Sequence, residues 1–204
     1  MPKDKTETHE KIIPAAIEEF LEYGFDKASM RRIGARIGIT AAALYCHFDS
    51  KEAMFAALVQ PVIDGLNEMY GSAQEQDFSE IGKIPPSELF NNNEEINMAM
   101  NYIYDNFDIF KLLVCRSQGT KYESFIHDIA MIEEKTSLKY IKELKKQGYN
   151  VRMPNPKEFH LLITANVHAI FEPVIHDFTR KEAIRYAKTL DEFFAAGWKK
   201  ILCL

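Results

Sequence analysis

The residues from Ser29 to Phe55 carry the clearest chemical pattern in the chain and read SMRRIGARIGITAAALYCHFDSKEAMF. Two short helical patterns, at 29–37 and 41–48, are joined by the turn residues Gly38 and Ile39. This is the layout of a helix-turn-helix, whose second helix enters a DNA major groove about 12 Å wide. Contact with duplex DNA is therefore the first chemistry that the sequence predicts.

The second of these helices presents small and polar side chains on its outer side. The alanines at 41–43 allow its backbone to approach DNA closely. Tyr45 and His47 carry polar tips suited to phosphate oxygens, although His47 has the alternative of being an ordinary surface histidine. Cys46 beside them fits an inert thiol better than a redox switch.

Positive charge is concentrated around this stretch, although the chain as a whole is acidic. The net charge of −5 excludes a strongly basic coating protein for nucleic acids but permits a compact reader with local cations. Lys51 stands at a predicted helix N-terminus, which is itself an anion site. The local cations, set against Asp26 and Asp49, are Lys27, Arg31, Arg32, Arg36 and Lys51.

Capping residues and apolar spacing predict the helices that must position this stretch. Ser29 and Thr40 are the predicted N-caps of the two short helices, and Gly34 permits close approach of another helix. The preceding helix has apolar residues at helical spacing and is predicted to end at Gly24. Pro14 lies in the first turn of that helix or kinks it.

The rest of the chain is also predicted to be helical, because hairpin signals and Val/Thr alternation are missing. Asp49 or Ser50 caps a helix from about Lys51 towards Tyr70, with a bend expected near Pro61 and Gly65. Two loops are then expected, one at 71–92, which has room for one short helix, and one at 148–156. Five further helices are expected at 94–106, 108–117, 121–147, 157–178 and 180–202.

The N-terminal segment resembles the tetracycline-repressor (TetR) family of regulators. The likeness rests on AAIEEFLEYGFDKASMRRIGARIGIT and on ALYCHFDSKEAMF, in which capping, glycine and aromatic positions match together. A plain helical bundle with charged faces is the alternative for residues 10–55, and the joint match argues against it. The resemblance implies a three-helix DNA-binding domain, a fourth helix that links it to a sensor, a homodimer, and repression as the favoured outcome.

The resemblance also implies roles for single residues. It places Ser29, Arg31, Tyr45, His47 and Lys51 at DNA phosphates, and Thr40, Ala41 and Ala42 near the bases. Family members commonly carry Lys or Gly where this chain has Ala42 and Ala43. Contacts to thymine methyls and recognition of groove shape are therefore expected at these positions.

The expected fold is all-α, with an N-terminal three-helix helix-turn-helix domain at 1–52 and a C-terminal helical bundle for ligand binding and dimerisation at 53–204. The last two predicted helices resemble the dimerisation pair of the family, which would form a symmetric four-helix interface with a second copy. Such a dimer suits a palindromic operator with half-sites about one helical turn apart. The residues expected in this interface are Phe159, Ile163, Val167, Ile170, Phe194, Gly197 and Trp198.

The middle helices are apolar enough to line an effector cavity, although a filled core is the alternative for any one residue. The candidate pocket residues are Tyr102, Phe107, Phe110, Phe125, His127 and Asn166. A small lipophilic or aromatic effector bound there would tilt the helix at 51–70 and shift the population away from the DNA-binding state. The alternative function is a DNA-binding regulator or architectural protein with no small-molecule effector.

Other chemistry is weakly indicated. One helix carries a polar stripe at i, i+4 spacing, which consists of His160, Thr164, His168, Glu172 and His176. A polar edge of the dimer interface or a pocket wall is favoured for this stripe over a metal site. The lysines at 135–146 are interpreted as a solvated face rather than a second DNA site. No P-loop, GxSxG, HExxH or paired-Cys motif occurs, so neither an enzyme nor a cofactor is expected. Three scattered cysteines and the lack of a long apolar run predict a cytoplasmic protein with no membrane partner.

Overall fold

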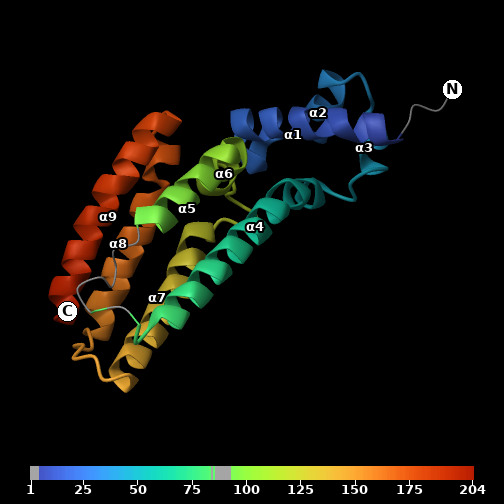
Figure 1. Cartoon of the computed structure of the whole chain (residues 1–204). Helices are drawn as coiled ribbons and strands as arrows, with labels where there is room; N and C mark the ends of the chain where they lie inside the picture. The colour runs from blue at the N-terminus through green and yellow to red at the C-terminus, as the bar shows by residue number, and fades with distance from the viewer. Residues whose placement is uncertain (1–4, 84, 86–92) are drawn as a thin grey trace. The chain divides into compact units, whose positions relative to one another are not determined.

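The computed structural model describes residues 5–83, 85 and 93–204 of the 204-residue chain. Every regular element in these ranges is an α-helix, which confirms the expected all-α class, and none of these helices is both long and apolar enough to cross a membrane. Figure 1 labels the helices in chain order. Their bounds are α1 Lys5–Lys27, α2 Met30–Arg36, α3 Ala41–Tyr45, α4 Lys51–Glu80, α5 Asn93–Asp105, α6 Phe107–Cys115, α7 Phe125–Lys146, α8 Pro156–Ile175 and α9 Arg180–Leu202.

The chain packs as two compact units. The first unit comprises residues 1–65 and 106–124, and the second comprises residues 66–105 and 125–204. α4 passes from the first unit into the second after Gly65. The bend expected in α4 near Pro61 stays a prediction. The functional limits 1–52 and 53–204 also stay a prediction, because units of packing need not coincide with domains of function.

The first unit is built on α1, against which α2 and α6 pack, with α3 packed on α2. Phe20 and Phe55 are fully buried, and their rings meet edge to face at a centroid distance of 5.1 Å. Phe25 extends this aromatic core, and its backbone N–H donates to the carbonyl of Arg116 at 3.0 Å. The segment at 106–124 thereby stabilises the N-terminal helices, a role that its sequence did not indicate.

Local signals explain several helix ends. Gly24 adopts a φ of 73° and a ψ of 164° and breaks the helical geometry of α1 where the sequence predicted its end. The hydroxyl of Thr40 accepts the N–H of Ala43 at 3.2 Å and caps α3 as predicted. The hydroxyl of Ser50 accepts the N–H of Ala53 at 3.0 Å, so Ser50 is the residue that caps α4.

α4 is longer than predicted. The expected loop at 71–92 is wrong in its first part, because α4 continues to Glu80, and most of the remainder lies outside the described residues. Side chains of α7 contact this part of α4. The amide of Gln74 donates to the hydroxyl of Thr136 at 3.1 Å, for example. Good helix formers at 73–76 extend α4, and the contacts with α7 hold it in place.

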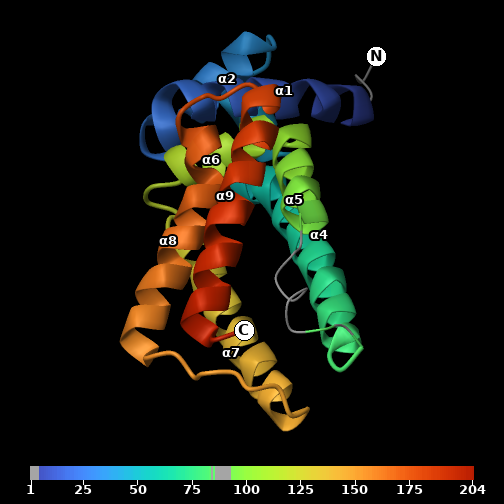
Figure 2. The same ribbon diagram turned by 60° about the vertical axis from the view of Figure 1, so that its left-hand side comes forward.

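The second unit packs α5 against α9 and α7 against α8, with α8 beside α9. Figure 2 shows the last two helices side by side. Met100 lies in a buried cluster with Ala183 and Ala187, whose small side chains allow α5 and α9 to approach closely. The rings of Phe159 and Trp198 join α8 to α9 at a centroid distance of 5.4 Å.

The turn between α2 and α3 requires glycine at two positions. Gly38 has a φ of +72°, in the left-handed region that other residues rarely adopt. A Cβ atom at Gly34 would lie 2.6 Å from the carbonyl oxygen of Ile39. The N–H of Ile39 donates to the carbonyl of Gly34 at 2.9 Å, so the two backbones are held in contact. The close approach expected at Gly34 is therefore made by the turn that leads into α3.

We predict that Gly34→Ala destabilises the first unit, although alanine is the better helix former. Overpacking against backbone costs about 1–3 kcal/mol, which exceeds the roughly 1 kcal/mol gained in helix propensity. Thermal unfolding followed by circular dichroism should show a lower midpoint. Gly71→Ala in α4 is the matched control, because no atom lies within 4 Å of its added Cβ. A G34A protein as stable as the unmodified chain would contradict the proposed backbone contact.

Candidate DNA-contacting surface and effector pocket

A buried carboxylate holds α2 against α1. Glu19 is 0% exposed, and its Oε1 accepts the backbone N–H of Ser29 at 2.9 Å and the Nε–H of Arg32 at 2.7 Å. Arg32 also donates to the carbonyl of Lys27 at 2.6 Å. A buried carboxylate needs such partners to replace its lost hydration. The helix-turn-helix pattern of the sequence does not include Glu19, although an acid directly before the core residue Phe20 was an available signal.

Arg36 is paired with α1 as well. Its guanidinium donates to the carboxylate of Glu22 at 2.6 Å and to that of Glu18 at 3.2 Å, and it lies 3.5 Å from Oε2 of Glu19. The hydrogen bond to Glu22 raises the pKa of Arg36. Two of the local cations counted in the sequence, Arg32 and Arg36, are therefore neutralised within the first unit.

The ammonium group of Lys51 is also used inside the first unit. It donates to the carbonyls of Phe25 at 2.7 Å, Asp26 at 3.1 Å and Ala28 at 3.4 Å. It also lies 4.4 Å from the centre of the Phe25 ring. An ammonium has three N–H donors, so these carbonyls account for all of them. The predicted phosphate contact of Lys51 would require its ammonium to leave this position.

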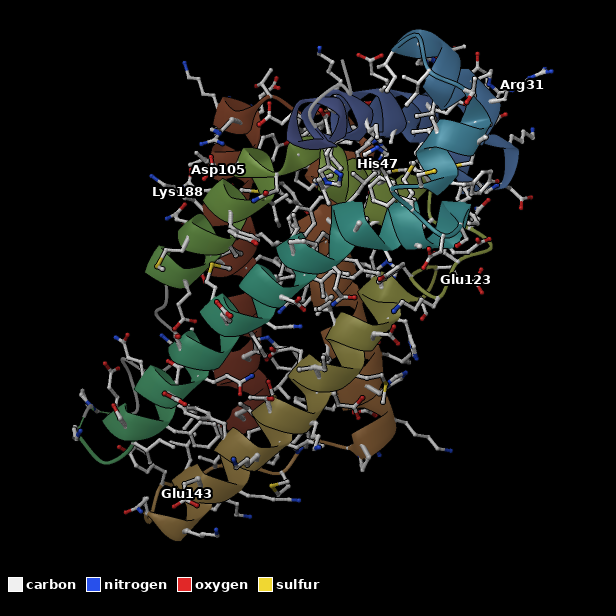
Figure 3. All side chains as sticks on the ribbon, turned by 90° about the vertical axis from the view of Figure 1, so that its right-hand side faces the viewer. Arg31, His47, Asp105, Glu123, Glu143 and Lys188 are labelled. Atoms are coloured by element: carbon white, nitrogen blue, oxygen red, sulfur yellow. The ribbon has the colours of Figure 1, made fainter. Side chains whose placement is uncertain are left out.

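Arg31 is exposed and makes no hydrogen bond or ion pair with the residues that the structure describes. Figure 3 shows its side chain extending away from the ribbon into solvent. Thr40 and Ala42 are exposed as well, and Tyr45 is 50% exposed. The other predicted contact residues on these elements, Ser29, Ala41 and His47, are half-buried. The outer side of α3 is thus small, open and accompanied by one unpaired arginine.

The inner side of this segment faces the core of the first unit. α3 ends at Tyr45, earlier than predicted, and Leu44 and Phe48 are buried. His47 follows in a turn, and its ring centre lies 6.2 Å from that of His9 on α1. The His9 ring stacks on Phe48 at 5.4 Å. The described contacts therefore place His47 beside the start of α1.

The residues of this surface lie within a segment that other proteins share. Residues 12–58 match the family model of bacterial regulatory proteins, tetR family. Over these residues the chain resembles the TetR family. The HTH-type transcriptional repressor Rv1474c of Mycobacterium tuberculosis is 42% identical over 50 residues, which are 24% of this chain and 27% of that protein. The negative regulator IcaR of the biofilm operon icaADBC of Staphylococcus aureus is 40% identical over 58 residues, which are 28% of this chain and 31% of that protein. The chain thus spans less than a third of the length of these curated relatives.

Solved structures resemble this chain over nearly its whole length. The regulator PfmR from Thermus thermophilus matches with a TM-score of 0.57 and 20% identity, over 89% of this chain and 97% of that one. The regulator FadR from Bacillus subtilis, solved in complex with stearoyl-CoA, matches with a TM-score of 0.58 and 14% identity, over 93% and 98%. At these identities the likeness shows the fold alone.

The second unit contains a pocket of about 660 Å³. α4, α5, α7, α8 and α9 contribute to its lining. Asn166 is one of its lining residues, as predicted. The other five predicted pocket residues do not line it and are Tyr102, Phe107, Phe110, Phe125 and His127. Phe110, for example, is fully buried within the first unit. Part of the wall comes from the end of α4, where the sequence predicted a loop.

Six residues predicted for the dimer interface line this pocket and are Phe159, Ile163, Val167, Ile170, Phe194 and Trp198. Four of them are at most 8% exposed in the single chain, so they offer little area to a partner. The seventh, Gly197, is half-buried, and a Cβ atom there would meet nothing within 4 Å. The six residues line the pocket because the most apolar sides of α8 and α9 face the interior of their own unit. A dimer contact through these helices would use their outer sides.

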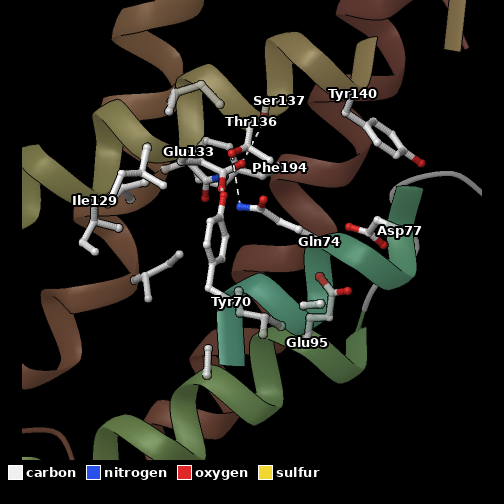
Figure 4. A pocket seen from close by; sticks show the side chains of 18 of the residues that line it. Tyr70, Gln74, Asp77, Glu95, Ile129, Glu133, Thr136, Ser137, Tyr140 and Phe194 are labelled. Carbon is white, nitrogen blue, oxygen red and sulfur yellow. Dashed lines mark hydrogen bonds between the residues drawn. The ribbon is translucent and has the colours of Figure 1, made fainter. Parts of the chain in front are cut away.

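One carboxylate in the pocket is held by two hydroxyl groups. The hydroxyl of Tyr70 donates to Oε2 of Glu133, and that of Ser137 donates to Oε1 at 2.7 Å. Figure 4 shows the contact between Tyr70 on α4 and Glu133 on α7, with Gln74 beside it. Burial, together with the negative charge of Glu133, raises the pKa of Tyr70 well above its ordinary value. Tyr70 is therefore a neutral donor at neutral pH, and Glu133 is held as an acceptor.

The histidine stripe of α8 is divided between separate contacts. Nδ1 of His160 lies 2.8 Å from the carboxylate of Glu134 on α7, and Nε2 of His176 lies 3.0 Å from that of Glu172. His168 is exposed. Among the residues that the structure describes, no group of three His, Cys, Asp or Glu side chains is arranged to hold a metal ion.

We predict that Glu19→Ala lowers the free energy of unfolding by about 2–3 kcal/mol, because it leaves the N–H of Ser29 and the guanidinium of Arg32 without their acceptor. Urea unfolding followed by circular dichroism measures this change. Glu18→Ala is the matched control: its side chain is 66% exposed, so its ion pair with Arg36 should contribute less than about 1 kcal/mol. Equal effects of the two substitutions would show that Glu19 has no special role.

Proposed function

We propose that this protein is a sequence-specific transcriptional repressor of the TetR family. It binds a palindromic operator as a homodimer and is released by a small lipophilic or aromatic effector. The observation that carries the proposal is the outer side of α3, which is small and exposed and begins at the Gly38 turn. Two relatives that match this segment are named as a repressor and a negative regulator, which supports repression.

α3 is proposed to enter the major groove of the operator. Thr40, Ala41 and Ala42 lie at its N-terminus, the part of a recognition helix that meets base edges. None of the three carries a side chain able to form two hydrogen bonds with one base, so thymine methyls and groove shape are the proposed sources of specificity. Arg31 and Tyr45 are the proposed phosphate contacts, because both are exposed and bear polar groups.

The remaining predicted phosphate contacts receive narrower roles. The N–H of Ser29 is bound to Glu19, which leaves its hydroxyl to contact phosphate. His47 keeps its proposed role at the phosphates. Lys51 is proposed to hold the start of α4 against the C-terminal end of α1 rather than to contact phosphate, since three carbonyls accept hydrogen bonds from its ammonium.

The proposed function is tested most directly by a gel shift with the DNA upstream of the protein's own gene, followed by footprinting. The protein should protect an inverted repeat with half-sites about one helical turn apart, and binding should weaken as salt rises. Binding that is indifferent to sequence would favour an architectural role. No binding to any duplex would contradict the proposal.

We predict that Arg31→Gln weakens operator binding without changing stability. The loss of one phosphate contact should lower the affinity and reduce the slope of log K against log salt by about 1. Fluorescence anisotropy with labelled operator at several salt concentrations measures both quantities. Lys188→Gln, which removes an exposed charge from α9, should leave them unchanged. Equal slopes for R31Q and the unmodified chain would remove Arg31 from the phosphate contacts.

The homodimer is proposed to form through the outer sides of α8 and α9. Leu161 on α8 is 66% exposed and Phe193 on α9 is 72% exposed, so the single chain presents large apolar side chains to solvent on both helices. Ala165 and Ala196, also exposed, lie one turn further along the same sides and allow close helix approach. Burial of this surface against a second copy would give a symmetric four-helix contact.

We predict that Phe193→Asp converts the dimer to a monomer. At a symmetric interface the new carboxylate would lie near the same carboxylate of the second copy and would lose its hydration. Sedimentation velocity should show the change in mass, and operator affinity should fall with it. Met131→Asp is the matched control, since Met131 is a large apolar side chain that is 44% exposed on α7. A dimeric F193D protein would place the interface elsewhere.

The pocket of the second unit is proposed as the effector site. Its volume of about 660 Å³ lies within the range of about 300–1,000 Å³ typical of small-molecule sites. α4 lines the pocket from Leu66 onward and belongs to the first unit up to Gly65. An effector that binds one position of α4 better than another would thereby change operator affinity. The similar FadR was solved with stearoyl-CoA, which supports effector binding by this fold. A regulator without an effector, the alternative, would show an operator affinity that no small molecule changes.

A further inference from the structure

The charged residues that line the effector pocket are all acidic. They are Asp77 on α4, Glu95 on α5, Glu133 on α7 and Asp191 on α9, and no Lys, Arg or His is part of the described lining. Four helices therefore each place one carboxylate at the same cavity. An anionic ligand would meet no cation on the pocket wall, and a cationic ligand would meet four possible partners.

The remainder of the lining is mainly apolar and aromatic. Trp198 and Phe194 lie on the same side of α9 as Asp191, at i+7 and i+3 from it. Asp191 makes no hydrogen bond with the residues that the structure describes. The faces of aromatic rings attract cations, and Trp does so most strongly. This side of α9 thus combines a carboxylate with two rings, which is a favourable setting for a cation carried on an apolar body.

The pocket also disfavours added negative charge. Burial raises the pKa of Tyr140 well above its ordinary value, and the charge of Asp77 raises it further. Burial raises the pKa of Asp191, the charge of Glu192 adds to this, and that of Lys199 opposes it. The other nearby cation, Lys139, lies 5.0 Å from the centre of the Phe78 ring and is not part of the lining. The surroundings of Tyr140 and Asp191 therefore disfavour a further negative charge, such as that of an anionic ligand.

We propose that the pocket takes a lipophilic cation, an aromatic or aliphatic body that carries one positive charge. Glu133, held in place by Tyr70 and Ser137, and Asp191 provide the countercharges, and the rings of α9 contact the apolar body. Such a cation is desolvated with partners already in place, whereas an anion of the same shape loses its hydration without compensation. The inference rests on the proposed function only where it concerns the effect of the ligand on operator affinity. Binding of the cation in the pocket can be tested without that effect.

Two ions of the same shape and opposite charge test the proposal: tetraphenylphosphonium and tetraphenylborate. Each is titrated into the full-length protein by isothermal calorimetry. Trp198 is the single tryptophan of the chain and lines the pocket, so its fluorescence reports whether binding occurs there. We expect the phosphonium ion to bind at least about tenfold more tightly than the borate, and to change Trp198 emission.

Two isosteric variants locate the charge. Glu133→Gln and Asp191→Asn should each weaken phosphonium binding by about three- to tenfold and narrow its advantage over the borate. Glu192→Gln is the matched control, because Glu192 is an exposed neighbour of Asp191 that does not line the pocket. It should leave both affinities within about twofold of those of the unmodified chain.

The outcomes separate this inference from the proposed function. Tighter binding of the borate, equal binding of the two ions, or no binding of either overturns the inference, whatever the protein does with DNA. Phosphonium binding that E133Q and D191N leave unchanged also overturns it. Phosphonium binding that is sensitive to these two variants supports the inference, and if operator affinity then stays constant, the effector role in the proposed function is what fails.

Discussion

The proposed DNA-contacting surface depends on the carboxylate of Glu19. This group is fully buried, and its charge is compensated by the N–H of Ser29 and the guanidinium of Arg32, which donate to it, and by Arg36 nearby. These two bonds place the start of α2 on α1. From there the backbone contact between Gly34 and Ile39 directs the chain into α3. The orientation of the proposed recognition helix thus follows from one buried charge and one contact that only glycine permits.

The same network explains how an acidic chain can present a surface for DNA. α1 neutralises Arg32 and Arg36 with its own carboxylates, and three carbonyls hold Lys51. Most of the local positive charge therefore serves the packing of the helix-turn-helix unit. Arg31 is exposed and has no partner among the described residues. Such a surface is suited to recognition through a close backbone approach and groove shape, with few phosphate contacts.

The second unit shows how one pair of helices can serve two purposes. The inner sides of α8 and α9 line the pocket and complete the core, as the buried pair Phe159 and Trp198 shows. Their outer sides carry Leu161 and Phe193, which the single chain leaves exposed. Because each helix is apolar on two sides, a ligand in the pocket and a second copy of the chain would act on opposite faces of the same helices.

The sequence by itself determined the features that depend on neighbouring residues. The helical class, the cap at Thr40, the break at Gly24 and the glycine turn at Gly38 are set within a few residues, and the structure bears them out. The family resemblance of residues 12–58 belongs to the same kind of local information.

Only the tertiary structure decided which charges are free, where the pocket lies and which sides of the last helices face inward. Lys51 bonds to carbonyls 23 to 26 residues earlier in the chain. Gln74 meets Thr136 across 62 residues, and both residues line the pocket. Helical spacing identifies apolar sides but not the element that will cover each of them. Residues distant in the sequence determine which element covers each apolar side, because burial depends on how the whole chain packs.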